Sequence, residues 1–227
     1  VQQGLNLIRS EYRQCWLFSI NNEFIIPDSL LSKTNITAIN YHDSLLPRYA
    51  GLNASNWAIL SGEKEHGISW HLMTKEIDAG DIAYRQIVPL VSENSVESLN
   101  LQCFEAALEG FSKLLSGIEH GTISYIPQYL QLRSYHGLAD RPAGACLVDF
   151  SDNAENLARL SRATSYRNTN NEFGVPRLKT GDRWYIVPEM TTVYGMKKMT
   201  PGTVISIDPQ HLIIAAGKDA VEISGIL

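Results

Sequence analysis

The chain has 227 residues, of which 44% are hydrophobic, a composition typical of a globular protein with one large or two small domains. It carries 19 basic and 24 acidic side chains, and this net charge of −5 does not indicate a polyanionic partner such as nucleic acid. No apolar run is long enough to span a bilayer, so no membrane partner is expected. Because Val1 is not a methionine and no signal-peptide pattern follows it, we expect the sequence to begin inside a longer polypeptide.

Three cysteines, Cys15, Cys103 and Cys146, are widely spaced and form no Cys-x-x-Cys pair. An odd number of scattered cysteines is typical of free thiols in a reducing compartment, so we expect a cytoplasmic protein. No His/Cys spacing indicates zinc. His66 and His71 fall on opposite faces of one expected strand, and no metal site is predicted.

The first half of the chain alternates between expected strands and helices. Short apolar runs predict strands at residues 15–20, 37–40, 67–73 and 82–90. Short helices are predicted at residues 28–33, after Pro27, and from a cap at Asn53 to Leu60, with Gly62 ending the second. The class predicted by this part of the chain is α/β.

The clearest predicted helix covers residues 95–118, and Asn94 with Glu97 forms a capping-box-like start. It carries one apolar stripe at spacings of three and four, made of Leu101, Phe104, Leu108, Phe111, Leu115 and Ile118. We expect the whole stripe to pack against the sheet.

A polar connection at residues 131–144 leads to a change of pattern. A helix is predicted at residues 153–164, with Asp152 and Glu155 in capping positions. Short strands separated by turn signals follow at 183–187, 202–207, 211–215 and 220–223. Such spacing predicts a small antiparallel β-barrel.

Two segments carry side chains suited to chemistry. Asn40 and His42 end an expected strand, and open α/β sheets bind ligands at the carboxyl ends of their strands. Because they are two residues apart on an extended chain, their side chains point the same way. Together they can bind a carbonyl oxygen and accept or donate a proton. The loop at residues 76–82 supplies carboxylates at Asp78 and Asp81, one of which can orient the imidazole.

These segments resemble the formyltransferase family that uses 10-formyltetrahydrofolate, which includes the methionyl-tRNA formyltransferases. The family pattern is Asn-x-His, then Ser-Leu-Leu-Pro and Gly, then a Gly-Ile-Ser-x-His-like strand and Asp-x-Gly. It is matched in order by Asn40, His42, residues 44–47, Gly51, residues 67–71 and residues 78–80.

The resemblance implies a role for each of three residues. Asn40 would stabilise an oxyanion, and His42 would bond the same oxygen or accept a proton. The family's carboxylate stands at the Asp-x-Gly position, so Asp78 rather than Asp81 would pair with His42 and fix its tautomer. We interpret His71 as a core or supporting histidine, and Ser44 as a turn residue rather than a nucleophile.

The resemblance also implies a Rossmann-like parallel sheet followed by a small C-terminal antiparallel β-barrel of OB-like form. The family's first two β-α units would then precede Val1, and the barrel would continue beyond Leu227. The expected boundaries are a catalytic domain at 1–135, a linker at 136–144 and the barrel domain at 145–227.

The implied formyl donor is 10-formyltetrahydrofolate. In the family, backbone groups of an Ile-Leu-Pro-like turn hold the pterin, and in this chain that turn contains Phe24, Ile25 and Ile26 before Pro27. Ile77 and Asp81, from the loop that carries Asp78, would complete the folate pocket.

The amine acceptor is inferred from the sequence of three short segments. Residues 41–44, 49–54 and 70–74 are most similar to formyltransferase domains of nonribosomal peptide and polyketide synthases. We therefore expect an aminoacyl group on a carrier protein as the acceptor. An amino-sugar nucleotide and methionyl-tRNA stay open, although residues 145–227, with nine basic and nine acidic side chains, do not favour tRNA. A formyltetrahydrofolate hydrolase and a non-catalytic folate-binding domain also stay open.

Overall fold

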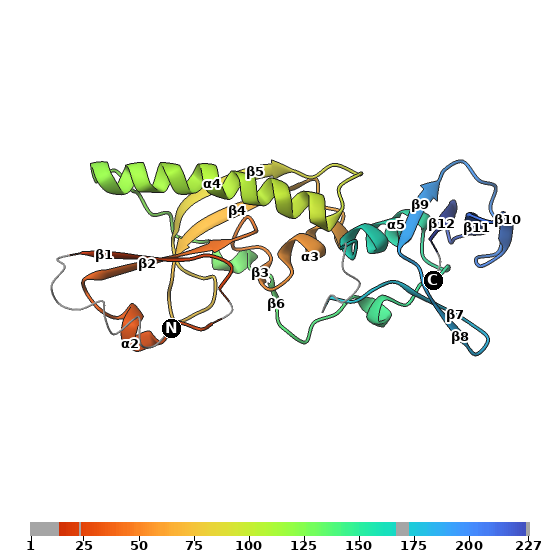
Figure 1. Cartoon of the computed structure of the whole chain (residues 1–227), viewed down its shortest axis with the longest axis horizontal. Coiled ribbons are helices and arrows are strands. Elements are labelled where there is room, and N and C mark those ends of the chain that lie inside the picture. The colour runs from red at the N-terminus through yellow and green to blue at the C-terminus, as the bar shows by residue number, and fades with distance from the viewer. Residues whose placement is uncertain (1–13, 23, 167–172, 226–227) are drawn as a thin grey trace. The chain divides into compact units, whose positions relative to one another are not determined.

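The structure of the protein is a computed structural model that describes residues 14–22, 24–166 and 173–225 (Figure 1). These residues form two compact units. The first contains the described residues up to 54, with 65–89 and 102–136, and the second contains 55–64, 90–101 and the described residues from 137 onward. The predicted domain boundaries stay predictions.

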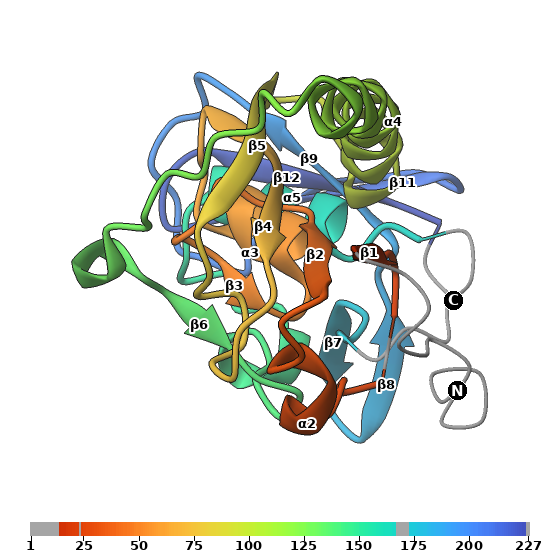
Figure 2. The ribbon, with the colours of Figure 1, turned by 90° about the vertical axis from the view of Figure 1, so that its left-hand side faces the viewer.

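The first unit is built on a four-stranded sheet of order β1-β2-β4-β5 (Figure 2). Its strands are β1 (Cys15–Ser19), β2 (Ile36–His42), β4 (Glu65–Leu72) and β5 (Ile82–Pro89). Strands β1 and β2 are parallel, whereas β4 runs antiparallel to both β2 and β5. The predicted α/β class is confirmed, but the sheet is mixed rather than parallel, because β4 and β5 each return along their neighbour.

Smaller elements complete this unit. They are the helix α2 (Asp28–Leu31), the 3-10 helix η1 (Leu130–Leu132) and the parallel pair β3 (Ala50–Gly51) and β6 (Tyr135–His136). The long helix α4 (Val96–His120) runs from residues of the second unit into the first and covers one face of the sheet (Figures 1 and 2). Its extent confirms the helix predicted at 95–118.

The side of α4 that packs on the sheet differs from the predicted one. Within the predicted stripe, Phe111 contacts the rings of Phe18 and Trp70. Four other members of the stripe, Leu101, Phe104, Leu108 and Leu115, are between 45% and 59% exposed. Within the first unit, the buried side of the helix instead carries mostly smaller residues, namely Cys103, Ala106, Ala107 and Leu114.

The close approach of α4 to the sheet explains this difference. A Cβ built on Gly110 would lie 2.6 Å from the ring of Tyr84, so the helix sits too near the sheet for large side chains on that side. Helical spacing finds the apolar residues but does not tell which of two adjacent apolar sides meets the sheet.

The second unit contains α3 (Ala54–Leu60) apart from its first residue, the 3-10 helix η2 (Ala143–Cys146) and α5 (Ala154–Ala163). Its main sheet is antiparallel, of order β10-β11-β12-β9, with β9 (Glu189–Val193), β10 (Val204–Ile207), β11 (His211–Ala215) and β12 (Ala220–Ser224). A separate antiparallel hairpin joins β7 (Arg177–Thr180) and β8 (Arg183–Ile186). The predicted antiparallel domain is confirmed, although β7 and β9 were not predicted.

Helix α5 packs its apolar side into the core of this unit, where Leu157 and Leu160 meet Val187, Met190 and Ile223. The residue that caps the helix is Asn153, whose side chain accepts a hydrogen bond from the Asn156 N–H at 2.9 Å. The prediction of Asp152 as the cap was therefore wrong by one position.

None of the three cysteines forms a disulfide, and Cys103 and Cys146 are buried. Among the helices of the described residues, none combines the length and apolarity that a bilayer crossing needs.

Candidate active site

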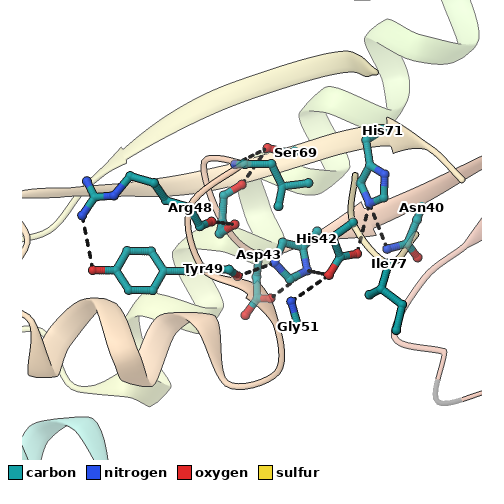
Figure 3. A network of polar contacts seen from close by, with 12 residues as sticks. Asn40, His42, Asp43, Arg48, Tyr49, Gly51, Ser69, His71 and Ile77 are labelled. Atoms are coloured by element: carbon teal, nitrogen blue, oxygen red, sulfur yellow. Dashed lines mark hydrogen bonds and ion pairs between the residues drawn. The ribbon is translucent and has the colours of Figure 1, made fainter. Parts of the chain in front are cut away.

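The register between β2 and β4 gathers polar side chains on one face of the sheet. Asn40 pairs directly with His71 across the two strands, and His42 follows two residues after Asn40 on the same face. The intervening pair, Tyr41 and Trp70, occupies the opposite face, which α4 covers. Figure 3 shows Asn40, His42 and His71 close together.

Asp78 reaches this face from the loop between β4 and β5. Its φ of 53° is left-handed, a conformation that aspartate adopts more readily than most residues. Two residues on, a Cβ at Gly80 would lie 1.9 Å from the carbonyl oxygen of Leu72, so only glycine lets the loop pass this close to the strand. The Asp-Ala-Gly sequence therefore turns the carboxylate back over the sheet.

The Asp78 carboxylate contacts three groups. Oδ2 accepts a hydrogen bond from the Gly51 N–H at 2.8 Å and lies 3.7 Å from Nδ1 of His42. Oδ1 lies 3.3 Å from Nε2 of His71. Burial alone would raise the pKa of Asp78, but these contacts, with the hydrogen bond to His71 the strongest, lower its pKa to about 2. Asp78 is therefore an anion at neutral pH.

The orientation of His42 is set by a backbone carbonyl. Its Nε2 lies 2.7 Å from the Tyr49 oxygen, which can only accept a hydrogen bond, so Nε2 carries the proton. Nδ1 faces two carboxylates, Asp78 at 3.7 Å and Asp43 at 4.0 Å. At 3.7 Å, Asp78 acts on His42 through charge, and the Tyr49 carbonyl has the orienting role that was expected of Asp78.

His71 belongs to the same network. Its Nδ1 lies 2.9 Å from the Leu72 carbonyl oxygen, and its Nε2 lies 3.3 Å from both Asn40 Nδ2 and Asp78 Oδ1. His71 was interpreted as a core or supporting histidine, but its contact with Asn40 and Asp78, two of the three expected catalytic residues, was not predicted. The signal that finds it is the Asn40–His71 pairing, which requires knowing that β4 runs antiparallel to β2.

The segment at residues 128–136 holds the loops around the site, and the sequence did not indicate this role. The Gln128 amide donates to the carbonyl oxygens of Asp78 at 2.9 Å and Gly80 at 2.7 Å. Ser134 accepts from the Tyr49 N–H at 2.7 Å through its hydroxyl and from the next N–H through its carbonyl. Both loops that shape the network are therefore tied to one later stretch of chain.

A cavity of about 490 Å³ opens beside this network. Asn40, His42 and Asp78 line it together with His71. So do four apolar residues expected to hold folate, namely Phe24, Ile25, Ile26 and Ile77. Asp81, the fifth, is not part of the lining, and its carbonyl oxygen instead accepts a hydrogen bond from the Leu72 N–H. In the described part of the chain, no three His, Cys, Asp or Glu side chains are grouped to hold a metal ion.

Two family models match the sequence. Residues 23–115 match the one described as Formyl transferase, and residues 143–226 match the one described as Formyl transferase, C-terminal domain. The chain therefore belongs to the formyltransferase family, as the resemblance of its motifs predicted.

Solved structures with the same fold include HypX from Aquifex aeolicus in complex with tetrahydrofolic acid. It is 19% identical with a TM-score of 0.70, and the match covers 93% of this chain but only 35% of HypX. An N-formyltransferase from Helicobacter canadensis, in complex with folinic acid and dTDP-3-aminofucose, is 18% identical with a TM-score of 0.73, covering 96% of this chain and 76% of that one. The sugar 3N-formyltransferase WlaRD, crystallised in the presence of dTDP and 5-N-formyl-THF, is 19% identical with a TM-score of 0.69. The match covers 92% of this chain and 72% of WlaRD.

Proposed function

We propose that the protein is an N-formyltransferase that moves a formyl group from 10-formyltetrahydrofolate to a primary amine. The observation that carries the proposal is the convergence of Asn40, His42 and an ionised Asp78 on one cavity. The membership of the chain in the formyltransferase family supports the same reaction.

The reaction forms a C–N bond to the incoming amine and breaks the bond between the formyl carbon and N10 of the folate. Negative charge develops on the formyl oxygen as the amine attacks. Asn40 is the donor for that oxygen, because its side-chain N–H groups belong to a half-buried amide that lines the cavity. An oxyanion donor of this kind typically contributes about 10²–10³ in turnover.

A proton must also leave the attacking nitrogen and reach N10. His42 is the group for this transfer, and Nδ1 is the nitrogen concerned because Nε2 is committed to the Tyr49 carbonyl. Asp78, 3.7 Å from Nδ1, stabilises the positive charge that the ring acquires on accepting the proton. General acid–base catalysis of this type contributes about 10²–10⁴.

The cavity has the character that a folate needs. Phe24 and Ile25 are 66% and 85% exposed, and Ile77 is also exposed, so an apolar surface is available beside the polar network. Such a surface suits the flat pterin and benzoyl rings, and burying these side chains under a ligand is favourable at about 25 cal/mol per Å². When bound, the donor supplies the activated formyl group.

For the acceptor, we propose an aminoacyl group carried by a carrier protein. The support is the similarity of residues 41–44, 49–54 and 70–74 to formyltransferase domains of nonribosomal peptide and polyketide synthases. The fold similarity to sugar N-formyltransferases favours an amino-sugar nucleotide as the second candidate. The acceptor binds next to His42, whichever of the two it is, because its amine must reach the formyl carbon.

The test is incubation of the full-length protein with 10-formyltetrahydrofolate and a panel of amines, followed by mass spectrometry. The panel contains an aminoacyl-phosphopantetheine carrier, a dTDP-amino sugar and methionyl-tRNA. The proposal expects one of them to gain the mass of one CO unit. Release of formate without any formylated amine identifies a hydrolase instead, and binding of folinic acid with neither product identifies a non-catalytic domain.

A further inference from the structure

His71 is buried, at 2% exposure, on the central strand β4, and each of its ring nitrogens has a defined partner. The Leu72 carbonyl, 2.9 Å from Nδ1, can only accept a hydrogen bond, so Nδ1 carries a proton. The orientation of the ring is therefore fixed by its own strand, and this fixes the position of Nε2, which faces the site.

That one nitrogen meets two residues of the proposed chemistry. Asn40 Nδ2 and Asp78 Oδ1 each lie 3.3 Å from it. With a neutral ring, the lone pair of Nε2 accepts an N–H from Asn40, which leaves the second N–H of the same amide for the cavity. With a charged ring, Nε2–H donates to Asp78. In both states the ring constrains a group that acts on the formyl oxygen or on His42.

We propose that His71 is a positioning residue for formyl transfer: Nε2 sets the direction in which Asn40 donates when the ring is neutral, and it anchors the carboxylate of Asp78 when the ring is charged. This inference rests on the proposed function and assigns a fourth side chain to the same site. His71 does not react; it acts through its two neighbours. The hydrogen bond from His71 is also the strongest of the contacts that lower the pKa of Asp78 against the opposing effect of burial.

The same strand supplies a matched control. His66 is also 2% exposed on β4, but it pairs with Val88 near the other end of the strand and does not line the cavity. Replacing His66 measures the cost of removing a buried imidazole from this sheet. Any additional effect at His71 belongs to the site.

The experiment uses the full-length protein with 10-formyltetrahydrofolate and the amine that the panel identifies. His71→Gln places an amide where Nε2 lies, whereas His71→Asn reproduces only the bond to Leu72. We expect kcat to fall by about 10²-fold in His71→Asn, because misplaced catalytic groups cost that much. We expect a smaller fall in His71→Gln, and a kcat near wild type in the folded fraction of His66→Gln.

A double-mutant cycle separates positioning from a general structural effect. In the Asn40→Ala background, His71→Asn should cost far less than in the wild type, because the amide that it orients is already gone. Equal losses in both backgrounds would overturn the inference, as would an unchanged kcat in folded His71→Asn. If the wild-type protein formylates no amine of the panel, the proposed function fails first, and that result is distinct from either of these.

A second readout needs neither activity nor a folded His71 variant. Nitrogen-15 NMR of the wild-type protein should show Nδ1 of His71 protonated, and Asn40→Ala should change the shift of Nε2. An Nε2 signal that does not respond to loss of the Asn40 amide would contradict the proposed contact.

Discussion

The Asp78→Asn substitution tests the electrostatics of the site. It replaces a carboxylate by an amide of the same size, and asparagine also adopts the left-handed φ of 53° found there. Burial opposes the charge, but the contacts with His71, His42 and Gly51 hold the pKa of Asp78 at about 2, against an ordinary value of 3.8. This difference corresponds to about 2 kcal/mol of folding stability from the ionised carboxylate.

The sign of the pH dependence follows from the lowered pKa. A carboxyl with a depressed pKa stabilises the folded state above its unfolded value of 3.8, and this stability is lost as the pH falls toward 2. The free energy of unfolding of the wild type should therefore fall by about 1 kcal/mol relative to that of Asp78→Asn between pH 6 and pH 3, and by about 2 kcal/mol when the pH reaches 2. Urea unfolding of both proteins across this range measures it. A stability difference that stays constant from pH 6 to pH 3 would refute the reasoning.

Activity gives the second half of this test. At neutral pH, Asp78→Asn should reduce formyl transfer by about 10²–10⁴, because His42 loses the charge that stabilises its protonated form. Asp81→Asn is the control from the same loop, since Asp81 does not line the cavity, and it should keep nearly full activity.

The remaining predictions concern single contacts. Asn40→Ala should lower kcat by about 10²–10³ and leave the affinity for folinic acid, measured by calorimetry, nearly unchanged; an unaltered kcat would remove Asn40 from the mechanism. Gln128→Ala leaves two loop carbonyls without their donor, so it should cost about 1–3 kcal/mol in urea unfolding and also lower kcat. Normal values of both would mean that the loop holds its shape without Gln128. Gly51→Ala should lower Tm more than Gly121→Ala: both glycines have positive φ, but only at Gly51 would the new Cβ lie 2.2 Å from the His136 carbonyl oxygen. Equal shifts in Tm would contradict this steric argument.

Local sequence signals were enough to find most of the helices and strands and to single out Asn40 and His42, whereas the choice of Asp78 over Asp81 came from the family resemblance. The β2 strand, the α4 helix and the Asp-Ala-Gly loop were predicted within a few residues of their observed bounds. Asn40 and His42 were expected on one face because a strand alternates its side chains, and the register of β2 confirms that placement.

Pairing between distant segments could not be predicted from these local signals. The role of His71 depends on β4 running antiparallel to β2, and strand direction is not encoded in the alternation of either strand. The bond from His42 to the Tyr49 carbonyl depends on how the 44–51 turn folds back. The exposed side of α4 was mistaken for its core side because helical spacing does not tell how closely the helix approaches the sheet.

The most direct measurement of the central claim is the single-turnover transfer of a carbon-13 formyl group from 10-formyltetrahydrofolate to the identified amine, in wild type and in His42→Ala. The proposed mechanism predicts that the label reaches the amine nitrogen in the wild type. In His42→Ala the rate should fall by about 10²-fold or more while folinic acid still binds. Equal transfer rates in the two proteins would show that the chemistry takes place without the network of Asn40, His42 and Asp78.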